Sequence, residues 1–347
     1  MKDAIYFLSE QSAGQKHAGC KARNDVERIF RESGFIAFEH MEVYTPSSLI
    51  HRFLRRLTVD HLKKIYRFLT LRGKVVFLQY PFPCDRFTYK AVCHLLQKNH
   101  ALLVVHDVDA LRDAGRYSLA EEARMLCMAD ALVVHNARMA AVLRKHGVDV
   151  PMMELGIFDY LLSEPFPETE RHLGPSIAFA GNLEKSRFLH GASMAALPLD
   201  IHLYGPNFSA EQIAGERVQY HGAFPPDQLP YELDGSFGLV WDGDSITSCT
   251  GPFGQYLRYN NPHKFSLFIA AGMPVITWRE AAIAEFIERE GIGFCVDSLP
   301  EIPERIAALS EETYQGYRHR LRALQQRVCT GFYMRRAVKQ ALEQVKE

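Results

Sequence analysis

The segment Asn260-Asn261-Pro262-His263-Lys264 is the strongest local signal for ligand binding in the chain. Asn261 is a suitable N-cap, and Pro262 suits the first helical position because its missing N–H would have no partner there. A helix that begins here presents unpaired backbone N–H groups and the positive end of its dipole, with Lys264 in its first turn. The segment is therefore a candidate diphosphate site. An ordinary capped helix with a solvated lysine explains the pattern equally well.

Two loops that follow apolar runs are further candidates for contact with a nucleotide. Gly181 permits a tight turn and close approach of a ligand, and Asn182 and Lys185 have side chains suited to phosphate or ribose. Tyr204 ends the next apolar run and is a weaker candidate of the same kind. Ordinary turns explain both loops as well, so neither loop identifies a site by itself.

His106 and Asp107 directly follow the apolar run 101–105. In a parallel sheet, the carboxyl end of a strand lies on the edge that faces a ligand. A carboxylate or imidazole at that edge is suited to act as the general base that deprotonates an acceptor hydroxyl. We therefore predict Asp107, with His106 as a second candidate, as catalytic. The alternative is that Asp107 caps the next segment or pairs with Arg112.

Asp242-Gly243-Asp244 looks like the Asp-x-Asp motif that holds a divalent metal on a diphosphate, and it also follows an apolar run. A helix N-terminus and lysines already offer positive charge for phosphates in this half of the chain. We therefore expect Asp242 and Asp244 to bind hydroxyl groups of a donor sugar, or to be simple turn carboxylates. No metal ion and no cofactor is expected.

The loop before residue 19 is rich in Gly, Ser and Ala and lies between the first apolar run and the first helical pattern. Its spacing is not that of a Walker P-loop, so the motif gives no support for a P-loop ATPase or kinase. As the first strand-to-helix turn of a domain, the loop is suited to shape an acceptor pocket. Gly19, Lys21 and Arg23 are the candidate acceptor contacts.

The elements that position these residues follow a β-α-β alternation, which predicts parallel sheets covered by helices on both faces. The predicted strands span residues 4–8, 75–78, 101–105 and 131–134, and then 177–180, 201–204, 237–241, 275–277 and 294–296. The predicted helices of the first half span residues 21–33, 49–71, 89–97 and 119–128. The last stretch, residues 311–346, is predicted to be helical with a break near Gly331.

The alternation stops near residue 155, where Pro165 and Pro167 indicate a linker. We predict an N-terminal acceptor domain at 1–158, a linker at 159–175, a C-terminal donor domain at 176–328, and a terminal helix at 329–347 that crosses back to the first domain. The fold class is α/β, with two facing Rossmann-like domains and a cleft between the carboxyl ends of their strands.

Composition narrows the function. The chain of 347 residues has a formal net charge of -1, which favours neither nucleic acid nor another polyanion as a partner. Its seven cysteines are scattered, which is typical of thiols in a reducing cytosol and indicates neither disulfides nor zinc. The first apolar run is too short for a signal peptide, and no stretch approaches the roughly 20 apolar residues that span a bilayer. We expect a cytoplasmic protein.

The segment His51–Lys74 contains eight basic side chains and a single acidic one, Asp60, interleaved with apolar residues. A helix with this composition is suited to rest on an anionic membrane, where each basic residue contributes about 1 kcal/mol. The alternative is a helix that packs its apolar face on the sheet and exposes its charges.

Taken together, these motifs resemble a family. The stretch from Phe237 through Trp241-Asp242-Gly243-Asp244 to residues 260–264 closely resembles bacterial β-1,6-galactofuranosyltransferases of O-antigen synthesis. The resemblance is spread over most of the chain and extends to residues 18–25, 106–112, 135–136, 157–161 and 180–183. The wider group includes glucosyltransferases that extend O-linked N-acetylglucosamine on bacterial adhesins.

The resemblance implies a GT-B fold, with the acceptor in the first domain and a UDP-sugar in the second. Donor-binding roles carry over best to Asn182, Lys185, Asn261 and Lys264. Many two-domain transferases place a glutamate five residues before the glycine of the last helix–strand turn to hold the ribose, but Leu267 stands there in this chain. The resemblance therefore favours an inverting displacement with an aspartate base. A homo-oligomer is compatible with it.

Three functions stay open at this stage. The expected one is inverting transfer of galactofuranose from a UDP-sugar to a lipid-linked or oligosaccharide acceptor in surface polysaccharide synthesis. The second uses UDP-glucose and a glycan or glycoprotein acceptor. The third is a nucleotide-sugar-binding protein without catalysis. The basic segment favours a membrane-borne acceptor and a position on the inner face of the cell membrane.

Overall fold

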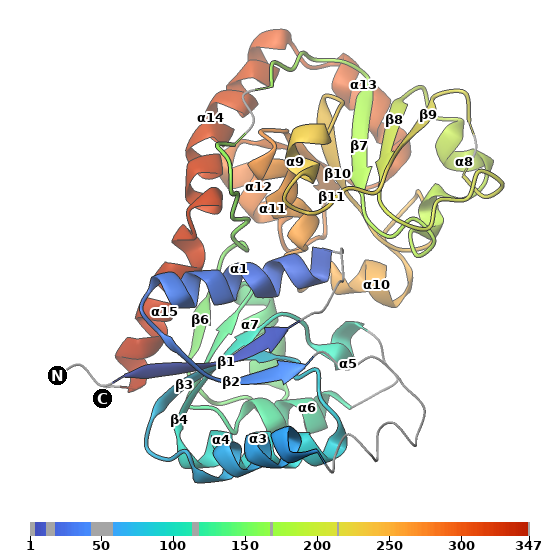
Figure 1. Ribbon diagram of the computed structural model, residues 1–347. Coiled ribbons are helices and arrows are strands. Elements are labelled where there is room, and N and C mark those ends of the chain that lie inside the picture. Colours follow the sequence, from blue (N-terminus) through green and yellow to red (C-terminus); the bar gives the residue numbers. More distant parts are fainter. Residues whose placement is uncertain are drawn as a thin grey trace.

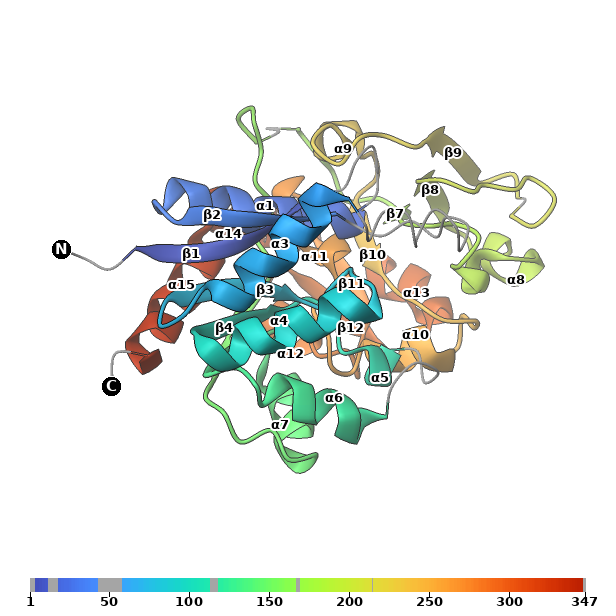
Figure 2. The same ribbon diagram turned by 60° about the horizontal axis from the view of Figure 1, so that its bottom comes forward.

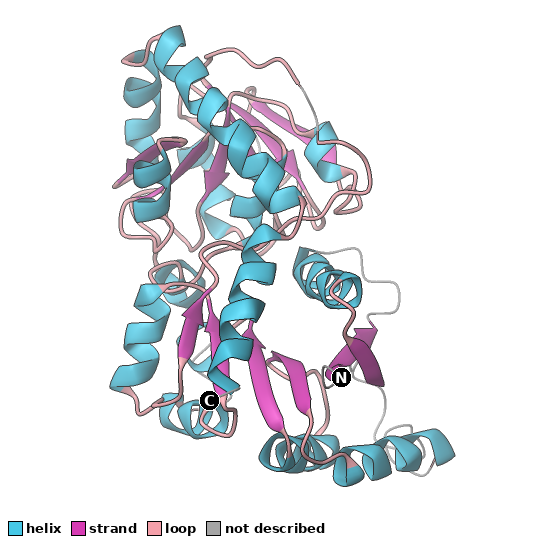
Figure 3. Cartoon of the chain, turned by 90° about the vertical axis from the view of Figure 1, so that its left-hand side faces the viewer, coloured by secondary structure: helices cyan, strands magenta, loops and turns pink. Residues whose placement is uncertain are grey.

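The computed structural model describes residues 4–11, 18–42, 58–112, 118–166, 169–213 and 215–345. These residues form two α/β halves, each built around a six-stranded sheet (Figure 1). Every strand pairing within the two sheets is parallel, and helices lie against the sheets of both halves (Figure 3). The predicted α/β class with two Rossmann-like domains is therefore confirmed.

The sheet of the N-terminal half has the strand order β2-β1-β3-β4-β5-β6. Its strands are β1 Ile5–Gln11, β2 Ile36–Glu42, β3 Val75–Tyr80, β4 His100–Val105, β5 Ala131–Val134 and β6 Met152–Glu154. Its helices are α1 Ala18–Glu32, α3 Val59–Thr70, α4 Arg86–Lys98, α5 Asp109–Arg112, α6 Leu119–Leu126 and α7 Ala137–Lys145. The strand order reverses between β1 and β3, which is where such sheets open a crevice for ligands.

The sheet of the C-terminal half has the order β12-β11-β10-β7-β8-β9. Its strands are β7 Ser176–Ala180, β8 Asp200–Tyr204, β9 Val218–Gly222, β10 Phe237–Val240, β11 Val275–Trp278 and β12 Gly293–Val296. Its helices are α8 Ala192–Ala195, α9 Leu229–Glu232, α10 Gly251–Tyr256, α11 His263–Ala270, α12 Ala284–Glu290, α13 Ile302–Ala307 and α14 Glu311–Cys329. Here the reversal lies between β7 and β10.

The last helix, α15, spans Phe332–Val345 and packs on β5 and β6 of the N-terminal half. It is separated from α14 by Gly331, which has a φ of 78° and lies against Ile29 of α1. The expected break at this glycine is confirmed. In Figure 1, α14 belongs to the upper half and α15 to the lower half, so the chain returns to the N-terminal half after Gly331.

Local sequence explains where several helices begin. Asp85 accepts hydrogen bonds from the backbone N–H groups of Phe87 and Thr88 and so caps α4. Ser118 and Glu121 form a reciprocal capping box at the start of α6. Such caps satisfy backbone donors that have no partner inside the helix. None of the helices within the described ranges is long and apolar enough to cross a bilayer.

Candidate functional site

A pocket of about 500 Å³ lies at the point where the strand order of the second sheet reverses. Its walls come from the loop after β7, the loop after β10 and the start of α10. The lining residues are Glu184, Lys185, Arg187, Gly243, Asp244, Thr250, Gly251, Pro252 and Phe253. We call it the β7–β10 pocket. Two predicted donor contacts, Lys185 and Asp244, thus lie in one cavity at the edge where open α/β sheets bind ligands.

Two glycines let the backbones of this edge approach closely. A Cβ on Gly243 would lie 2.2 Å from the carbonyl oxygen of Thr250, and its φ is 109°. A Cβ on Gly205 would lie 1.9 Å from the carbonyl oxygen of Gly181. Side chains do not fit at such distances, so glycine is required at both positions. Asn182 contributes to the same turn, because its Oδ1 accepts a hydrogen bond from the backbone N–H of Lys185 at 3.3 Å.

Lys264 reaches the same edge from α11. Its Nζ lies 2.9 Å from Oδ2 of Asp242, 3.2 Å from the carbonyl oxygen of Trp241, and 4.7 Å from the ring centre of Phe179. The ammonium group is therefore held beside the ends of β7 and β10, and Asp242 serves as its counter-ion. The described residues contain no group of three or more His, Cys, Asp or Glu side chains placed to hold a metal ion.

The predicted capping role of Asn261 is wrong. Helix α11 begins at His263, the N-cap is Pro262, and no side chain caps it. The Asn261 amide points instead to the N-terminal half: Nδ2 donates to the carbonyl oxygens of His135 and Gly156, and Oδ1 accepts from Asn136. Both amide hydrogens are used, so the side chain joins the two halves and has no N–H left for a donor phosphate.

Two other predicted donor contacts are packed away from the pocket. Tyr204 is fully buried, and its hydroxyl accepts a hydrogen bond from the backbone N–H of Asp234 at 2.8 Å. The ring of His263 stacks on Tyr160 with 4.9 Å between centres. Burial lowers the pKa of His263 to about 3, so the imidazole is neutral. The expectation of direct donor contact through the Tyr204 side chain is therefore wrong, and His263 contacts the segment between the halves.

On the N-terminal edge, His106 and Asp107 lie at the carboxyl end of β4. His106 is 9% exposed, and its Nε2 lies 2.7 Å from Oε1 of Gln79. Burial lowers the pKa of His106 well below its usual value, so the ring is neutral. Asp107 pairs with Arg112, as the alternative prediction had it, and its side chain stays 29% exposed. Burial nevertheless raises the pKa of Asp107 to about 6, which is suited to general-base work.

Sequence reasoning missed a second carboxyl group at this edge. Glu10 lies near the carboxyl end of β1, beside the reversal between β1 and β3. One of its carboxylate oxygens binds the guanidinium of Arg23. Its other oxygen, Oε1, is buried and accepts no hydrogen bond from a residue that the structure describes. Burial raises the pKa of Glu10 to about 7 against the effect of Arg23. The signal available in the sequence was an acidic residue at the carboxyl end of a predicted strand.

The predicted acceptor contacts are placed differently from one another. Arg23 donates to the carbonyl oxygen of Pro81 at 2.8 Å and lies at the cleft edge with a side chain that is 18% exposed. Gly19 is in the first turn of α1. The Lys21 side chain is 7% exposed. Its Nζ lies 2.7 Å from Oδ1 of Asp25 and 2.8 Å from Oδ1 of Asp227, and it donates a hydrogen bond to the carbonyl oxygen of Leu161.

Three partners account for all three N–H donors of the Lys21 ammonium group. The expectation of an acceptor contact at Lys21 is therefore wrong, and the residue fastens the two halves together. Asp159, in the connecting segment, accepts hydrogen bonds from the backbone N–H groups of Tyr333 and Met334 in the first turn of α15. The two cleft edges are thus held in a defined relation by buried polar contacts.

The family model described as the N-terminal domain of glucosyltransferase 3-like proteins matches residues 5–157, and the model of the C-terminal domain matches residues 177–341. The chain is 29% identical over 353 residues to the β-1,6-galactofuranosyltransferase WbbI of Escherichia coli strain K12, covering 99% of both chains. It is 29% identical over 351 residues to glucosyltransferase 3 of Streptococcus gordonii, covering 98% of this chain and 97% of the relative.

Solved structures show the same fold at low identity. Sucrose-phosphate synthase from Thermosynechococcus elongatus has a TM-score of 0.64 and 15% identity, covering 99% of this chain and 100% of that chain. Anabaena HepE, determined with UDP and glucose, has a TM-score of 0.61 and 11% identity, covering 98% of this chain and 99% of that chain. The predicted GT-B arrangement is confirmed.

Proposed function

The chain belongs to the glucosyltransferase 3-like family, and from this premise we propose that it transfers galactofuranose from a UDP-sugar to a hydroxyl group of a glycan acceptor. It is a glycosyltransferase with the GT-B fold. The observation that supports a nucleoside-diphosphate donor is the β7–β10 pocket. It lies at a switch point of the sheet, with Lys185 and Arg187 on its wall and Lys264 beside it.

In the proposed reaction, the acceptor hydroxyl attacks the anomeric carbon of the donor sugar from the side opposite to the diphosphate. The new carbon–oxygen bond forms as the bond to the β-phosphate breaks, and the hydroxyl proton passes to a carboxylate of the N-terminal edge. Asp107 is the proposed base. The leaving UDP carries the negative charge, which cationic side chains of the C-terminal edge offset. We propose that no metal ion is needed for this step.

The donor sugar is tested by UDP release. UDP-galactofuranose, UDP-glucose and UDP-galactopyranose would each be supplied with a short α-glucoside acceptor, with and without EDTA. The proposal predicts turnover with the furanose donor and no loss with EDTA. Turnover restricted to a pyranose donor would refute galactofuranose. Loss of activity with EDTA that Mg²⁺ or Mn²⁺ restores would refute metal independence.

A second candidate is transfer of glucose from UDP-glucose to a glycan or an O-linked glycoprotein. The family model and the streptococcal relative both carry the name glucosyltransferase 3, which supports it. The same donor panel separates the two candidates, because turnover with UDP-glucose alone would favour this second one.

We also propose that the protein acts at an anionic membrane surface through α3. Residues 58–74 of the predicted basic segment are described and include α3, whereas residues 51–57 lie outside the described ranges. Figure 2 shows α3 beside α4 on one face of the first sheet. Ile65 and Phe68 pack inward, as the alternative prediction required. The outward face carries a second apolar stripe with exposed fractions of 41–68%, formed by Val59, Leu62, Tyr66 and Leu69.

This stripe follows the helical spacing and lies among Lys63, Lys64 and Arg67, the combination that suits an anionic interface. Replacing Leu62 and Tyr66 by serine should lower binding to phosphatidylglycerol vesicles about tenfold, because apolar burial in the interface is lost. The control is Phe332→Ser, which removes an exposed aromatic ring of α15. Unchanged vesicle binding of the double variant, or dissociation of an oligomer in solution, would show that α3 has another partner.

A further inference from the structure

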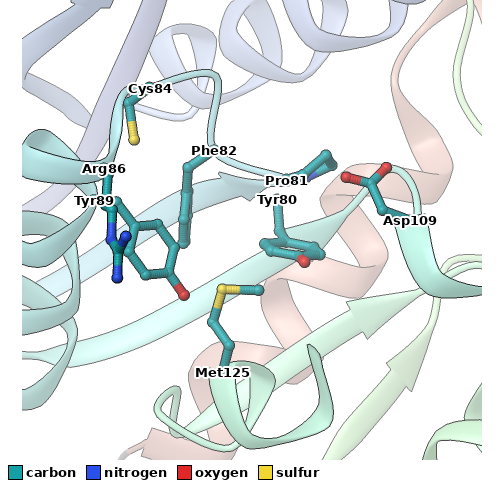
Figure 4. Close-up of a pocket in the computed structure, with 8 residues that line it drawn as sticks. All are labelled: Tyr80, Pro81, Phe82, Cys84, Arg86, Tyr89, Asp109 and Met125. Carbon is teal, nitrogen blue, oxygen red and sulfur yellow. The ribbon is translucent and has the colours of Figure 1, made fainter. Parts of the chain in front are cut away.

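A second cavity, of about 340 Å³, opens at the carboxyl end of β3 in the N-terminal half (Figure 4). It is separate from the β7–β10 pocket and contains no residue of the C-terminal half. Its lining residues come from the end of β3, the start of α4, α5 and α6, and they are Tyr80, Pro81, Phe82, Cys84, Arg86, Tyr89, Asp109 and Met125. We call it the β3 pocket.

Aromatic rings form one side of the β3 pocket. Phe82 meets Tyr80 edge to face with 5.5 Å between ring centres, and it meets Tyr89 at 6.3 Å. The hydroxyl of Tyr80 donates to Glu122 at 2.6 Å, which fixes its ring. Figure 4 shows the rings of Phe82 and Tyr89 on one side of the space, Asp109 on the other side and Met125 from a neighbouring helix. A fixed aromatic wall suits the C–H face of a sugar ring.

Polar groups stand at two ends of the cavity. Arg86 is exposed at the start of α4. Asp109 uses Oδ1 to accept a hydrogen bond from Arg112 at 3.0 Å. Its other oxygen, Oδ2, takes part in none of the hydrogen bonds among the residues that the structure describes. One end of the pocket therefore offers a carboxylate oxygen to a hydroxyl donor, and the other end offers a guanidinium.

The β3 pocket is joined to the proposed base through one side chain. Arg112 binds Asp107 with one guanidinium nitrogen and Asp109 with another. The wall of the pocket and the proposed base are thus two residues apart in sequence and share a counter-ion. The backbone of Pro81, another wall residue, is held by Arg23 at the cleft edge. A molecule in this pocket would therefore lie beside the site of proton removal.

We propose that the β3 pocket binds the acceptor, and that its occupant is a neutral hexopyranosyl unit. The role of this sugar as the acceptor rests on the proposed function, whereas the binding of a sugar in the pocket does not. The carboxylate of Asp109 disfavours a phosphate or a carboxylate in this part of the pocket, and an apolar chain would leave that carboxylate without a partner. A neutral sugar stacks on the aromatic wall and donates hydroxyl hydrogens to Asp109.

The pocket is tested by binding in the absence of any donor. Methyl glycosides of glucose, galactose and N-acetylglucosamine, with hexanol as the apolar probe, would be titrated by saturation-transfer NMR against the wild-type chain. The variants are Tyr89→Ala and Arg86→Ala. The matched control is Lys98→Ala, which removes an exposed charge from the other end of the same helix.

At least one glycoside should bind to the wild type and to Lys98→Ala, and its affinity should fall about three- to tenfold in each pocket variant. Thermal unfolding of each variant would establish that it is folded. Binding of hexanol with no glycoside bound, or a glycoside affinity that both pocket variants retain, would overturn the proposal. A chain that binds glycosides here but turns over no UDP-sugar would refute the proposed function and leave the pocket assignment intact.

Discussion

The two edges of the cleft differ in charge and in burial. The N-terminal edge presents carboxyl groups whose pKa values burial raises, Asp107 and Glu10, beside the neutral ring of His106. The C-terminal edge presents Lys185 and Lys264 around a pocket shaped by glycines. One edge is suited to accept a proton and the other to offset charge on a leaving group. In the proposed mechanism, each half of the chain therefore supplies a different part of the reaction.

The largest effect should come from removing the proposed base. Asp107→Asn keeps the shape of the side chain but cannot accept the acceptor proton, so kcat should fall about 10²- to 10⁴-fold. The measurement is UDP release at saturating donor and acceptor. Asp244→Asn, on the opposite edge, should keep kcat within a few-fold. Equal losses in the two variants would contradict a separate role for the N-terminal edge.

The pH profile distinguishes the two carboxyl groups of the N-terminal edge. Only the ionised form of a base accepts a proton, so kcat/KM should be high above the pKa of the base and fall as the pH drops through it. If Asp107 is the base, the fall of kcat/KM on the acid side of the profile is centred near pH 6, and it stays there in the Glu10→Gln variant. If kcat/KM instead falls near pH 7, and the Glu10→Gln variant no longer shows this fall, the base is Glu10.

Breaking the Asn261 contacts between the two edges should lower the free energy of unfolding. Asn261→Ala removes hydrogen bonds to His135, Gly156 and Asn136, and we expect a loss of about 2–4 kcal/mol in the free energy of unfolding. Urea unfolding would measure it. The adjacent Asn260→Ala is the control, because Oδ1 of Asn260 is buried without a hydrogen-bond partner among the described residues. A similar loss in both variants would show that Asn261 has no special role.

The smallest effect should come from the rim of the β7–β10 pocket. Arg187 is exposed there, and exposed charges are screened by solvent. Arg187→Ala should therefore weaken UDP binding only about two- to fivefold, with more effect at low salt than at high salt. An unchanged UDP affinity at low salt would place the phosphates away from this part of the rim.

Most of the fold could be predicted from the sequence because the central strands are continuous apolar runs. The predicted run 131–134 coincides with β5, and 75–78 and 201–204 lie within β3 and β8. The strands that were missed, β2, β6 and β9, are all at sheet edges. β6 has three residues and β9 exposes most of its side chains, so neither produces the apolar pattern of a buried strand.

The site was less predictable, for a physical reason. Strand ends identify which residues reach the ligand-facing edge, and that signal placed Asp107, Lys185 and Asp244 correctly at the two edges. The position at a strand end does not show which polar side chains already have all their hydrogen-bond partners in contacts between the halves. Lys21 and Asn261 have the residue types of a binding site, yet each has a partner from a segment more than 100 positions away in the sequence. Only the tertiary structure reveals such pairings.

The most direct test of the division between the edges is calorimetric titration of UDP into three proteins: wild type, Lys264→Ala and Asp107→Asn. Lys264→Ala should weaken UDP binding about tenfold or more, because a charge-assisted contact to the diphosphate is lost. Asp107→Asn should bind UDP with wild-type affinity although it turns over poorly. Wild-type affinity in Lys264→Ala, or a comparable loss in Asp107→Asn, would contradict the account.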